Sequence, residues 1–255
     1  MVKKEFHFID THCHLEDDEF NSRIDMVIQK ASTQKIGMIS SAIRPDTWEK
    51  GHQISKQYDT VFLSIGLDPI QYQYVSEASE FISKNKDEIV AVGEIGLDHY
   101  RIRDHRQREA QANAFKNLIE IARELSVPIQ VHSRSAGKKA LDILEDMEAV
   151  NIHMHAFDGR SSYAQKASRD LGYYFSIPTS IVRSRQKQKM VKAIEIERLL
   201  LETDSPVLGP EKGERNVPSN ITIALDEVSK ILQREKEELR EIILANTLRL
   251  YQRIK

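Results

Sequence analysis

The sequence is poor in cysteine, glycine and proline and has no long apolar run, and each shortage excludes a class of protein. Cys13 is the only cysteine among 255 residues, so neither an internal disulfide nor a cysteine-based zinc site can form. The 10 glycines and 7 prolines form no linker or low-complexity tract at which the chain would divide. No apolar stretch approaches the roughly 18 residues of a membrane-spanning helix, and no signal-peptide core follows the N-terminus. We therefore expect one domain over residues 1–255, in the reducing cytoplasm and without a membrane partner.

An excess of charge of one sign is also missing. Lysine and arginine total 37 against 39 aspartates and glutamates, which gives a net charge of −2. A protein that coats duplex phosphates normally has a basic excess, so that class is excluded. An enzyme that grips one or two phosphates through bound cations needs no such excess, and its contact with DNA would be local. No obligate protein partner can be read from the sequence.

The sequence does contain a regular alternation of two kinds of segment. Short β-branched or apolar runs alternate with longer segments whose apolar residues recur at three- and four-residue spacing, which is typical of βαβ units. The predicted strands cover residues 5–10, 36–41, 61–66, 89–94, 127–132, 150–155, 172–176 and 198–203. The predicted helices cover residues 21–34, 45–57, 73–86, 104–125, 135–148, 161–170, 185–195 and 219–232, with a ninth near 235–253. Eight such pairs form either a closed barrel or an open doubly wound sheet.

Polar residues at the ends of the predicted strands decide between these two folds. Six of them lie at the C-terminal end of a strand or one to four residues beyond it: His12, His14, Glu94, His132, His155 and Asp204. In a barrel these strand ends form one ring around one mouth, where active sites of that fold lie. In an open sheet the first and last strands would lie far apart. The sequence therefore predicts an α/β fold, a (β/α)8 TIM barrel, as a single domain with an extra C-terminal helix.

The first two strand-end motifs contain residues that can bind cations. His12 and His14 are two positions apart on an extended segment, so both imidazoles project to one side and can share a cation. Cys13 points to the opposite face, where we expect a small buried side chain. Glu94 directly follows an apolar run, where an unpaired carboxylate is costly to desolvate. It suits an anionic bridge that offsets the repulsion between two dications. Surface histidines and a salt-bridged glutamate are the alternative interpretations.

Histidine also ends the fifth and sixth predicted strands. A lone strand histidine is usually a core residue, but two at the same height on neighbouring strands favour a shared metal site. His132 ends one run, and His155 is preferred to His153 because it lies nearer the C-terminal mouth. His153 is then expected one layer lower.

The last strand ends in an acid, Asp204, followed by Ser-Pro. Its carboxylate can ligate a cation and accept a proton from the attacking water, which makes it the candidate general base. A turn or N-cap role is the alternative. The whole set predicts two divalent cations, with Zn, Mn, Co and Mg all compatible with mixed imidazole and carboxylate ligands.

Six ordered motifs run nearly from end to end of the chain: FIDTHCHL (8–15), VGEIGLD (92–98) with YR (100–101), VHSR (131–134), HAFDG (155–159), LETDSP (201–206) and RNVP (215–218), with AN (245–246) near the end. Together they resemble the TatD family of metal-dependent deoxyribonucleases, in the amidohydrolase superfamily. The resemblance implies cleavage of phosphodiester bonds in DNA, from an end, by a metal-activated water.

The resemblance also implies a role for each site residue. One metal would be surrounded by His12, His14, Glu94 and Asp204, and the other by Glu94, His132 and His155. Arg134 and Arg215 would contact substrate phosphates, a role for which the planar guanidinium is suited. These arginines could equally hold loops together.

Two motifs depart from the family pattern, and each departure adds an acid. Asp68 replaces the histidine of the family's Gly-x-His-Pro, and Asp158 lies in His-Ala-Phe-Asp-Gly where the family has His-Cys-Phe-Ser-Gly. Extra negative charge would repel a phosphate. The alternative function is hydrolysis of an amide, lactone or aminoacyl ester on the same dinuclear site. A metal-stabilised scaffold without turnover is a third hypothesis, which the presence of all six ligands disfavours.

Overall fold

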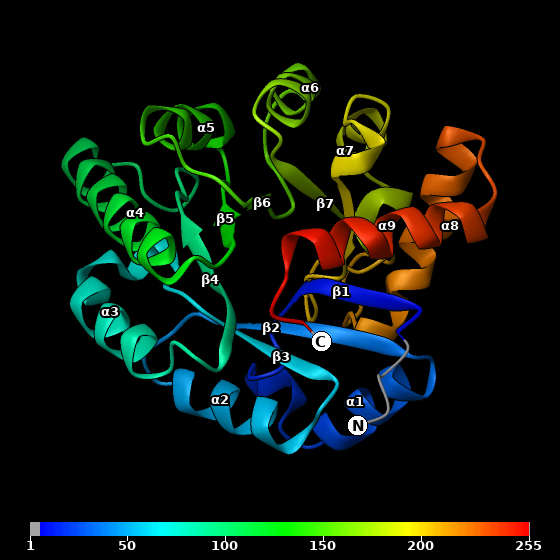
Figure 1. Ribbon diagram of the computed structural model, residues 1–255, viewed down its shortest axis with the longest axis horizontal. Coiled ribbons are helices and arrows are strands. Elements are labelled where there is room, and N and C mark those ends of the chain that lie inside the picture. Colours follow the sequence, from blue (N-terminus) through cyan, green and yellow to red (C-terminus); the bar gives the residue numbers. More distant parts are fainter. Residues whose placement is uncertain (1–5, 255) are drawn as a thin grey trace.

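The computed structural model describes residues 6–254 and shows eight parallel strands ringed by helices (Figure 1). The strands pair in sequential order, and every recorded neighbour is parallel. They are β1 (Phe8–Cys13), β2 (Ile36–Ala42), β3 (Val61–Ile65), β4 (Ile89–Gly96), β5 (Ile129–His132), β6 (Ile152–Met154), β7 (Tyr174–Pro178) and β8 (Leu199–Glu202). This order confirms the predicted (β/α)8 barrel.

Hydrogen bonds just beyond the strand ends bring β1 and β8 together. The amide of Asp204 donates to the carbonyl of His12 over 2.9 Å, and the amide of His14 donates to the carbonyl of Ser205 over 2.8 Å. Deeper in the barrel, the hydroxyl of Thr11 donates to the carbonyl of Leu201 over 2.9 Å. Closure of the barrel and placement of three predicted site residues therefore depend on the same contacts.

Helices follow the strands and cover the outside of the barrel (Figure 1). They are α1 (Ile24–Thr33), α2 (Trp48–Gln57), α3 (Val75–Lys84), α4 (His105–Leu125), α5 (Gly137–Asp146), α6 (Ser161–Asp170), α7 (Arg185–Val191), α8 (Ile221–Leu232) and α9 (Lys236–Leu250). Short 3-10 turns lie at η1 (Asp18–Phe20), η2 (Pro69–Tyr74), η3 (Thr179–Val182), η4 (Ile196–Arg198) and η5 (Pro218–Asn220). The helix α9 confirms the predicted C-terminal addition. Among the described residues, no helix combines the length and apolar character that a membrane crossing needs.

Apolar residues fill two separate layers. The larger cluster lies between the strands and the surrounding helices, which is why the run of β4 is buried along its whole length. A smaller cluster contains Ile9, Ile39 and Leu200 from the strands, together with Leu250 and Tyr251 from the C-terminal segment. The chain returns from α9 toward the middle of the ring of strands (Figure 1). The C-terminal segment therefore packs against the inner residues of the barrel.

The observed strand and helix ends differ from the predicted ones by a few residues. β1 covers Phe8–Cys13 and not 5–10, and residue 5 lies outside the described residues. The strand continues because Cys13 still pairs with Ser40 of β2, so His12 lies within the strand. α7 ends at Val191, before the predicted 195, where the chain enters tight turns such as the one from the amide of Ala193 to the carbonyl of Met190.

Candidate metal centre

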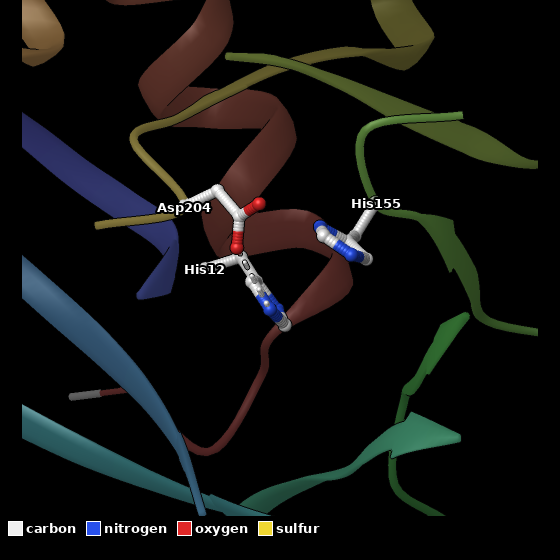
Figure 2. A group of neighbouring side chains, drawn as sticks. All are labelled: His12, His155 and Asp204. Atoms are coloured by element: carbon white, nitrogen blue, oxygen red, sulfur yellow. Dashed lines mark ion pairs between the residues drawn. The ribbon is translucent and has the colours of Figure 1, made fainter. Parts of the chain in front are cut away.

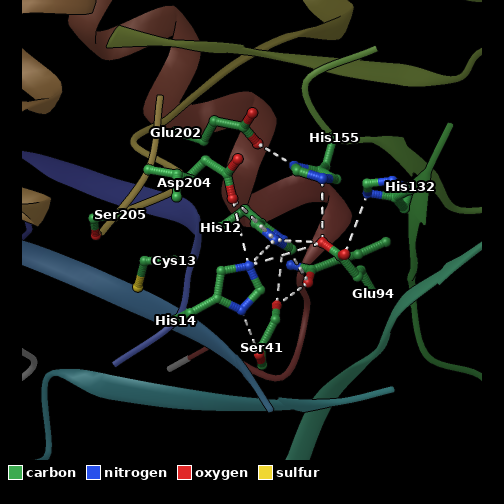
Figure 3. A network of polar contacts seen from close by, with 12 residues as sticks. His12, Cys13, His14, Ser41, Glu94, His132, His155, Glu202, Asp204 and Ser205 are labelled. Carbon is green, nitrogen blue, oxygen red and sulfur yellow. Dashed lines mark hydrogen bonds and ion pairs between the residues drawn. The ribbon is translucent and has the colours of Figure 1, made fainter. Parts of the chain in front are cut away.

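The six predicted ligands converge at the C-terminal mouth of the barrel (Figure 3). Three overlapping groups have ligand atoms that all lie within 4.8 Å of one another. The groups are His12, His14 and Glu94; Glu94, His132 and His155; and His12, His155 and Asp204. Figure 2 shows the third group, with β1, the β6–α6 loop and the segment after β8 each contributing one side chain. Residues separated by up to 192 positions thus share one pocket.

Glu94 lies between the first two groups. Its Oε2 is 2.9 Å from Nε2 of His12 and 3.1 Å from Nε2 of His155, while its Oε1 is 3.2 Å from Nδ1 of His132. Burial alone would raise the pKa of this carboxyl, but the positive charges of His132 and His155, with the close contact of His12, hold it well below its usual value. A buried, ionised carboxylate with its two oxygens facing different imidazoles has the arrangement of a bridging ligand.

Hydrogen bonds on the outer side of His12 and His14 determine which ring nitrogen faces the pocket. Nδ1 of His14 lies 2.8 Å from the carbonyl of Ser41, which can only accept, so this nitrogen carries the hydrogen. Nδ1 of His12 lies 3.2 Å from Oε1 of Gln130. Both Nε2 atoms therefore point inward, and they face each other at 3.2 Å. Two such nitrogens at this distance need a shared proton or a cation between them.

The distances also suit a small dication. Donor atoms bound at about 2.1 Å in a tetrahedral arrangement lie about 3.4 Å apart. Around the first group the separations run from 2.9 Å for His12 and Glu94 to 3.9 Å for His14 and Glu94. Oδ1 of Asp204 is 3.4 Å from Nε2 of His14 and 3.7 Å from Nε2 of His12. The donor set fits a bound divalent cation without rearrangement of the backbone.

His132 and His155 complete the second group, and each has a carboxylate behind it. Nε2 of His132 lies 3.4 Å from Oδ2 of Asp98, and Nδ1 of His155 lies 3.4 Å from Oε2 of Glu202. Burial would lower the pKa of His132, but the charge of Glu94 and the contact with Asp98 raise it to about 9. Both ring nitrogens of His132 and Oε2 of Glu94 are buried without a hydrogen-bond partner. Buried polar atoms without a hydrogen-bond partner are typical of side chains arranged to ligate an ion.

Asp204 reaches the pocket because its backbone adopts an unusual conformation. Its φ is 55°, in the left-handed region that non-glycine residues seldom occupy. The hydrogen bond from its amide to the carbonyl of His12 holds this conformation. The carboxylate therefore turns inward at the mouth, where it meets the two histidines of β1.

The two predicted phosphate-binding arginines lie apart from the ligands. The guanidinium of Arg134 stacks over the ring of Tyr100, 4.1 Å from its centroid, and among the described residues no carboxylate pairs with it. Arg215 donates from Nε to Oε2 of Glu19 over 2.7 Å. Arg134 is therefore the better placed of the two to accept a phosphate, while Arg215 joins two loops.

The sequence analysis did not identify the residues that orient the ligands, although strand alternation could have located two of them. Gln130 and Glu202 lie two positions before His132 and Asp204, so strand alternation puts each on the same face, one layer deeper. His153, expected one layer lower than His155, occupies that layer too. Cys13, on the opposite face as predicted, is buried and donates to the carbonyl of Ile39.

A family model described as TatD related DNase matches residues 9–252. The chain belongs to this family. The TatD family assignment also confirms the predicted class, a metal-dependent hydrolase acting on ester bonds. The six motifs that resemble the family lie within or directly beside the matched residues.

This TatD chain matches several relatives of similar length. It is 36% identical to human deoxyribonuclease TATDN3, over 97% of this chain and 95% of the relative. It is 32% identical to an uncharacterized metal-dependent hydrolase of Methanocaldococcus jannaschii, over 96% of this chain and 97% of that one. The crystal structure of the TatD homologue YjjV from Escherichia coli K12 superposes with a TM-score of 0.87 at 23% identity, covering 96% of this chain and 98% of that one. The last comparison supports the fold alone.

Proposed function

We propose that this chain is a deoxyribonuclease that hydrolyses phosphodiester bonds of DNA from a strand end, on a site that holds two divalent cations. The observation that carries the proposal is Glu94, whose two oxygens face separate sets of imidazoles over 2.9–3.2 Å. One carboxylate in that position can serve two cations at once. The family relative named deoxyribonuclease supports DNA as the substrate.

The donor set indicates which side chains would hold each cation. His12, His14, Glu94 and Asp204 would hold one, and Glu94, His132 and His155 the other. Two cations so bound would polarise a phosphate oxygen and lower the pKa of water, which is the chemistry that phosphodiester hydrolysis needs. Zn, Mn, Co and Mg all accept such ligands, so elemental analysis of protein purified without chelator identifies the ions.

The chain itself supplies a proton acceptor. Oδ1 of Asp204 faces His14 and His12, and among the described residues Oδ2 makes no recorded hydrogen bond. This oxygen, at the mouth of the barrel, is placed to take a proton from the attacking water. The fixed backbone of Asp204 keeps the carboxylate in position without reorganisation.

A cavity in the segments that follow His132 and His155 contains cationic side chains that suit a polyanionic substrate. This space of about 480 Å³ is lined by the loops after β5 and β6 and the start of α5, among them Lys139, Arg160 and Asp158, while Lys138 of its lining pairs with Asp142. Arg134 precedes this stretch and stays without a carboxylate partner among the described residues. A strand whose scissile phosphate lies at the ligands can run toward these cations. This local positive surface explains how a chain of net charge −2 can bind DNA.

The test compares substrates and variants in the presence of Mn²⁺. Labelled linear single-stranded DNA, the same DNA as a closed circle, bis-p-nitrophenyl phosphate, a lactone panel and N-acyl amino acids are incubated with the wild type and with Asp204→Asn. The matched control is Asp46→Asn, whose side chain is 75% exposed. We expect stepwise shortening of the linear strand only, lost by at least 100-fold in Asp204→Asn and retained in Asp46→Asn. Turnover of carbonyl substrates alone would overturn the proposal in favour of an amide or ester hydrolase.

A further inference from the structure

We propose that Tyr251 is a positioning residue for the metal centre: across the inside of the barrel, its hydroxyl connects Gln130, which orients His12, with His153 and, through Ser176, with Glu202, whose carboxylate lies beside His155. The inference rests on the proposed ligand set and concerns how that set is held. It assigns a role in the site to the C-terminal segment, which lies on the other side of the ligands from the substrate mouth.

Tyr251 is buried inside the barrel. It follows α9, its amide donates to the carbonyl of Thr247, and its side chain is fully buried among the inner apolar residues. Its ring meets the ring of His153 edge-on, with centroids 6.0 Å apart. Burial raises the pKa of the Tyr251 hydroxyl, so the group keeps its proton and can donate.

The hydrogen bonds that connect Tyr251 with His12 have a fixed donor and acceptor at each step. Nε2 of Gln130 donates to the carbonyl of Thr11 over 2.8 Å, and this carbonyl can only accept, so the orientation of the amide is settled. The same nitrogen donates to the hydroxyl of Tyr251 over 3.0 Å. Oε1 then faces Nδ1 of His12 at 3.2 Å and also accepts from Ser41 over 2.5 Å. The hydrogen of His12 is thereby held on Nδ1, and Nε2 is left for a cation.

The donors and acceptors between Tyr251 and Glu202 follow from this assignment. Because the Tyr251 oxygen already accepts from Gln130, its hydrogen is directed to Nδ1 of His153 over 2.6 Å. Nε2 of His153 then donates to the hydroxyl of Ser176 over 2.6 Å. Ser176 in turn donates to Oε2 of Glu202 over 2.5 Å.

The chain of hydrogen bonds ends at Glu202, beside the second histidine. Oε2 of Glu202 lies 3.4 Å from Nδ1 of His155, and Nε2 of His155 faces Glu94 over 3.1 Å. Gln130, Tyr251, His153 and Ser176 each accept once and donate once along the chain, and the Glu202 carboxylate accepts at its end. Tyr251 is the member that comes from outside the strands, and without its hydroxyl the buried Nδ1 of His153 loses its donor and Gln130 loses one of its two acceptors.

The test uses Tyr251→Phe, which removes the hydroxyl and keeps the ring. The matched control is Tyr173→Phe, a buried tyrosine of the outer core cluster that takes no part in the chain. The first readout is the tautomer of His153 together with the ¹⁵N chemical shift of its Nδ1, read from long-range ¹H–¹⁵N spectra of the cation-free and Zn²⁺-loaded proteins. The second is the Zn²⁺ dissociation constant, obtained by competition with a chelator at fixed pH.

We expect the wild type to show His153 protonated on Nε2 alone. Direct partners of metal-binding histidines typically contribute 10- to 100-fold in affinity, so a more distant member is expected near the lower end, with Zn²⁺ binding to Tyr251→Phe weakened about 10-fold. In that variant Nδ1 of His153 loses its hydrogen-bond donor, so the ¹⁵N chemical shift of Nδ1 should move toward that of a ring nitrogen without a partner. Tyr173→Phe should match the wild type in both readouts.

A second variant tests the same hydrogen bonds, and two outcomes would contradict the role of Tyr251. Ser176→Ala interrupts the chain between the strands and should weaken Zn²⁺ binding in the same way if Tyr251→Phe fails to fold. A wild-type His153 that carries its hydrogen on Nδ1, or a folded Tyr251→Phe with an unchanged ¹⁵N shift of His153 Nδ1 and an unchanged Zn²⁺ affinity, would overturn the role of Tyr251. Neither readout involves DNA, so failure of the nuclease proposal would leave these measurements standing.

Discussion

Loading of the metal centre should release protons, and the amount follows from His132. Burial would lower the pKa of His132, but Glu94 and Asp98 raise it to about 9 in the cation-free protein. At pH 7 this imidazole therefore carries a proton that a cation must displace before it can bind the ring. Burial would likewise lower the pKa of His14 and of His155, but their carboxylate neighbours, Asp204 and Glu202 foremost, raise both well above the usual value. Without cations, the imidazoles of His132, His14 and His155 therefore carry protons at pH 7.

The size of the effect can be worked from the printed pKa. Two units between pH 7 and a pKa of about 9 correspond to about 3 kcal/mol, or about 100-fold in the apparent dissociation constant. Between pH 7 and 8 the affinity should improve about tenfold for His132 alone. The raised pKa of His132 also makes the stability of the cation-free fold depend on pH. Because the folded pKa lies above the unfolded value of about 6.5, its stabilisation of the cation-free fold is complete below pH 6.5 and is lost as the pH rises to about 9.

Calorimetric titration with Mn²⁺ in buffers of different ionisation enthalpy measures this release. At pH 7 we expect at least one proton released per protein molecule, and one fewer for His132→Asn. Melting temperatures of the cation-free and loaded proteins should diverge as the pH rises from 6.5 to 9. A binding heat that does not depend on the buffer, or equal proton counts for the wild type and His132→Asn, would refute the reasoning.

Three other changes test separate parts of the structure. Glu94→Gln keeps the size of the bridge but removes its charge, so the number of bound cations measured by elemental analysis should fall from two to one or fewer. Lys187→Met should lower the free energy of unfolding in urea by about 2 kcal/mol, because the buried ammonium donates to the carbonyls of Ala156 and Phe157, each over 2.7 Å, and both would lose their partner. Arg134→Ala should raise KM for DNA several-fold with little change in kcat; equal KM values for this variant and the wild type would exclude the arginine as a phosphate contact.

The barrel and its ligands are predictable because both follow simple periodicities. Parallel strands bury both faces, so each appears as an apolar run, and the first polar residue after the run lies at the mouth. Glu94 and His132 both follow this rule, and the structure places both in one pocket. His12 was expected beyond the first strand and lies within it, because a strand that borders a polar centre can carry polar residues on its inner face.

The orientation of the ligands was not predictable, because it depends on contacts between distant segments. Gln130 meets Tyr251 across 121 positions, and Thr11 meets Gln130 across 119. Periodicity places Gln130 on the inner face of its strand but says nothing of its partner. The prediction for 235–253 was a helical appendage, and no pattern there indicates that the chain returns afterwards to the inside of the barrel.

The two acids that depart from the family pattern have structural partners, and this bears on the substrate. Oδ1 of Asp68 accepts from the amide of Ile70 over 3.1 Å and caps η2, while Oδ2 lies 3.6 Å from the guanidinium of Arg101. Oδ2 of Asp158 accepts from the amide of Ser135 over 2.7 Å, and Oδ1 accepts from Gln186 over 3.2 Å. Each carboxylate oxygen thus already faces a donor or a cation within its own loops, which offsets its repulsion of a phosphate. These acids favour a carbonyl substrate only if they face the substrate without a partner, and in the structure both have partners.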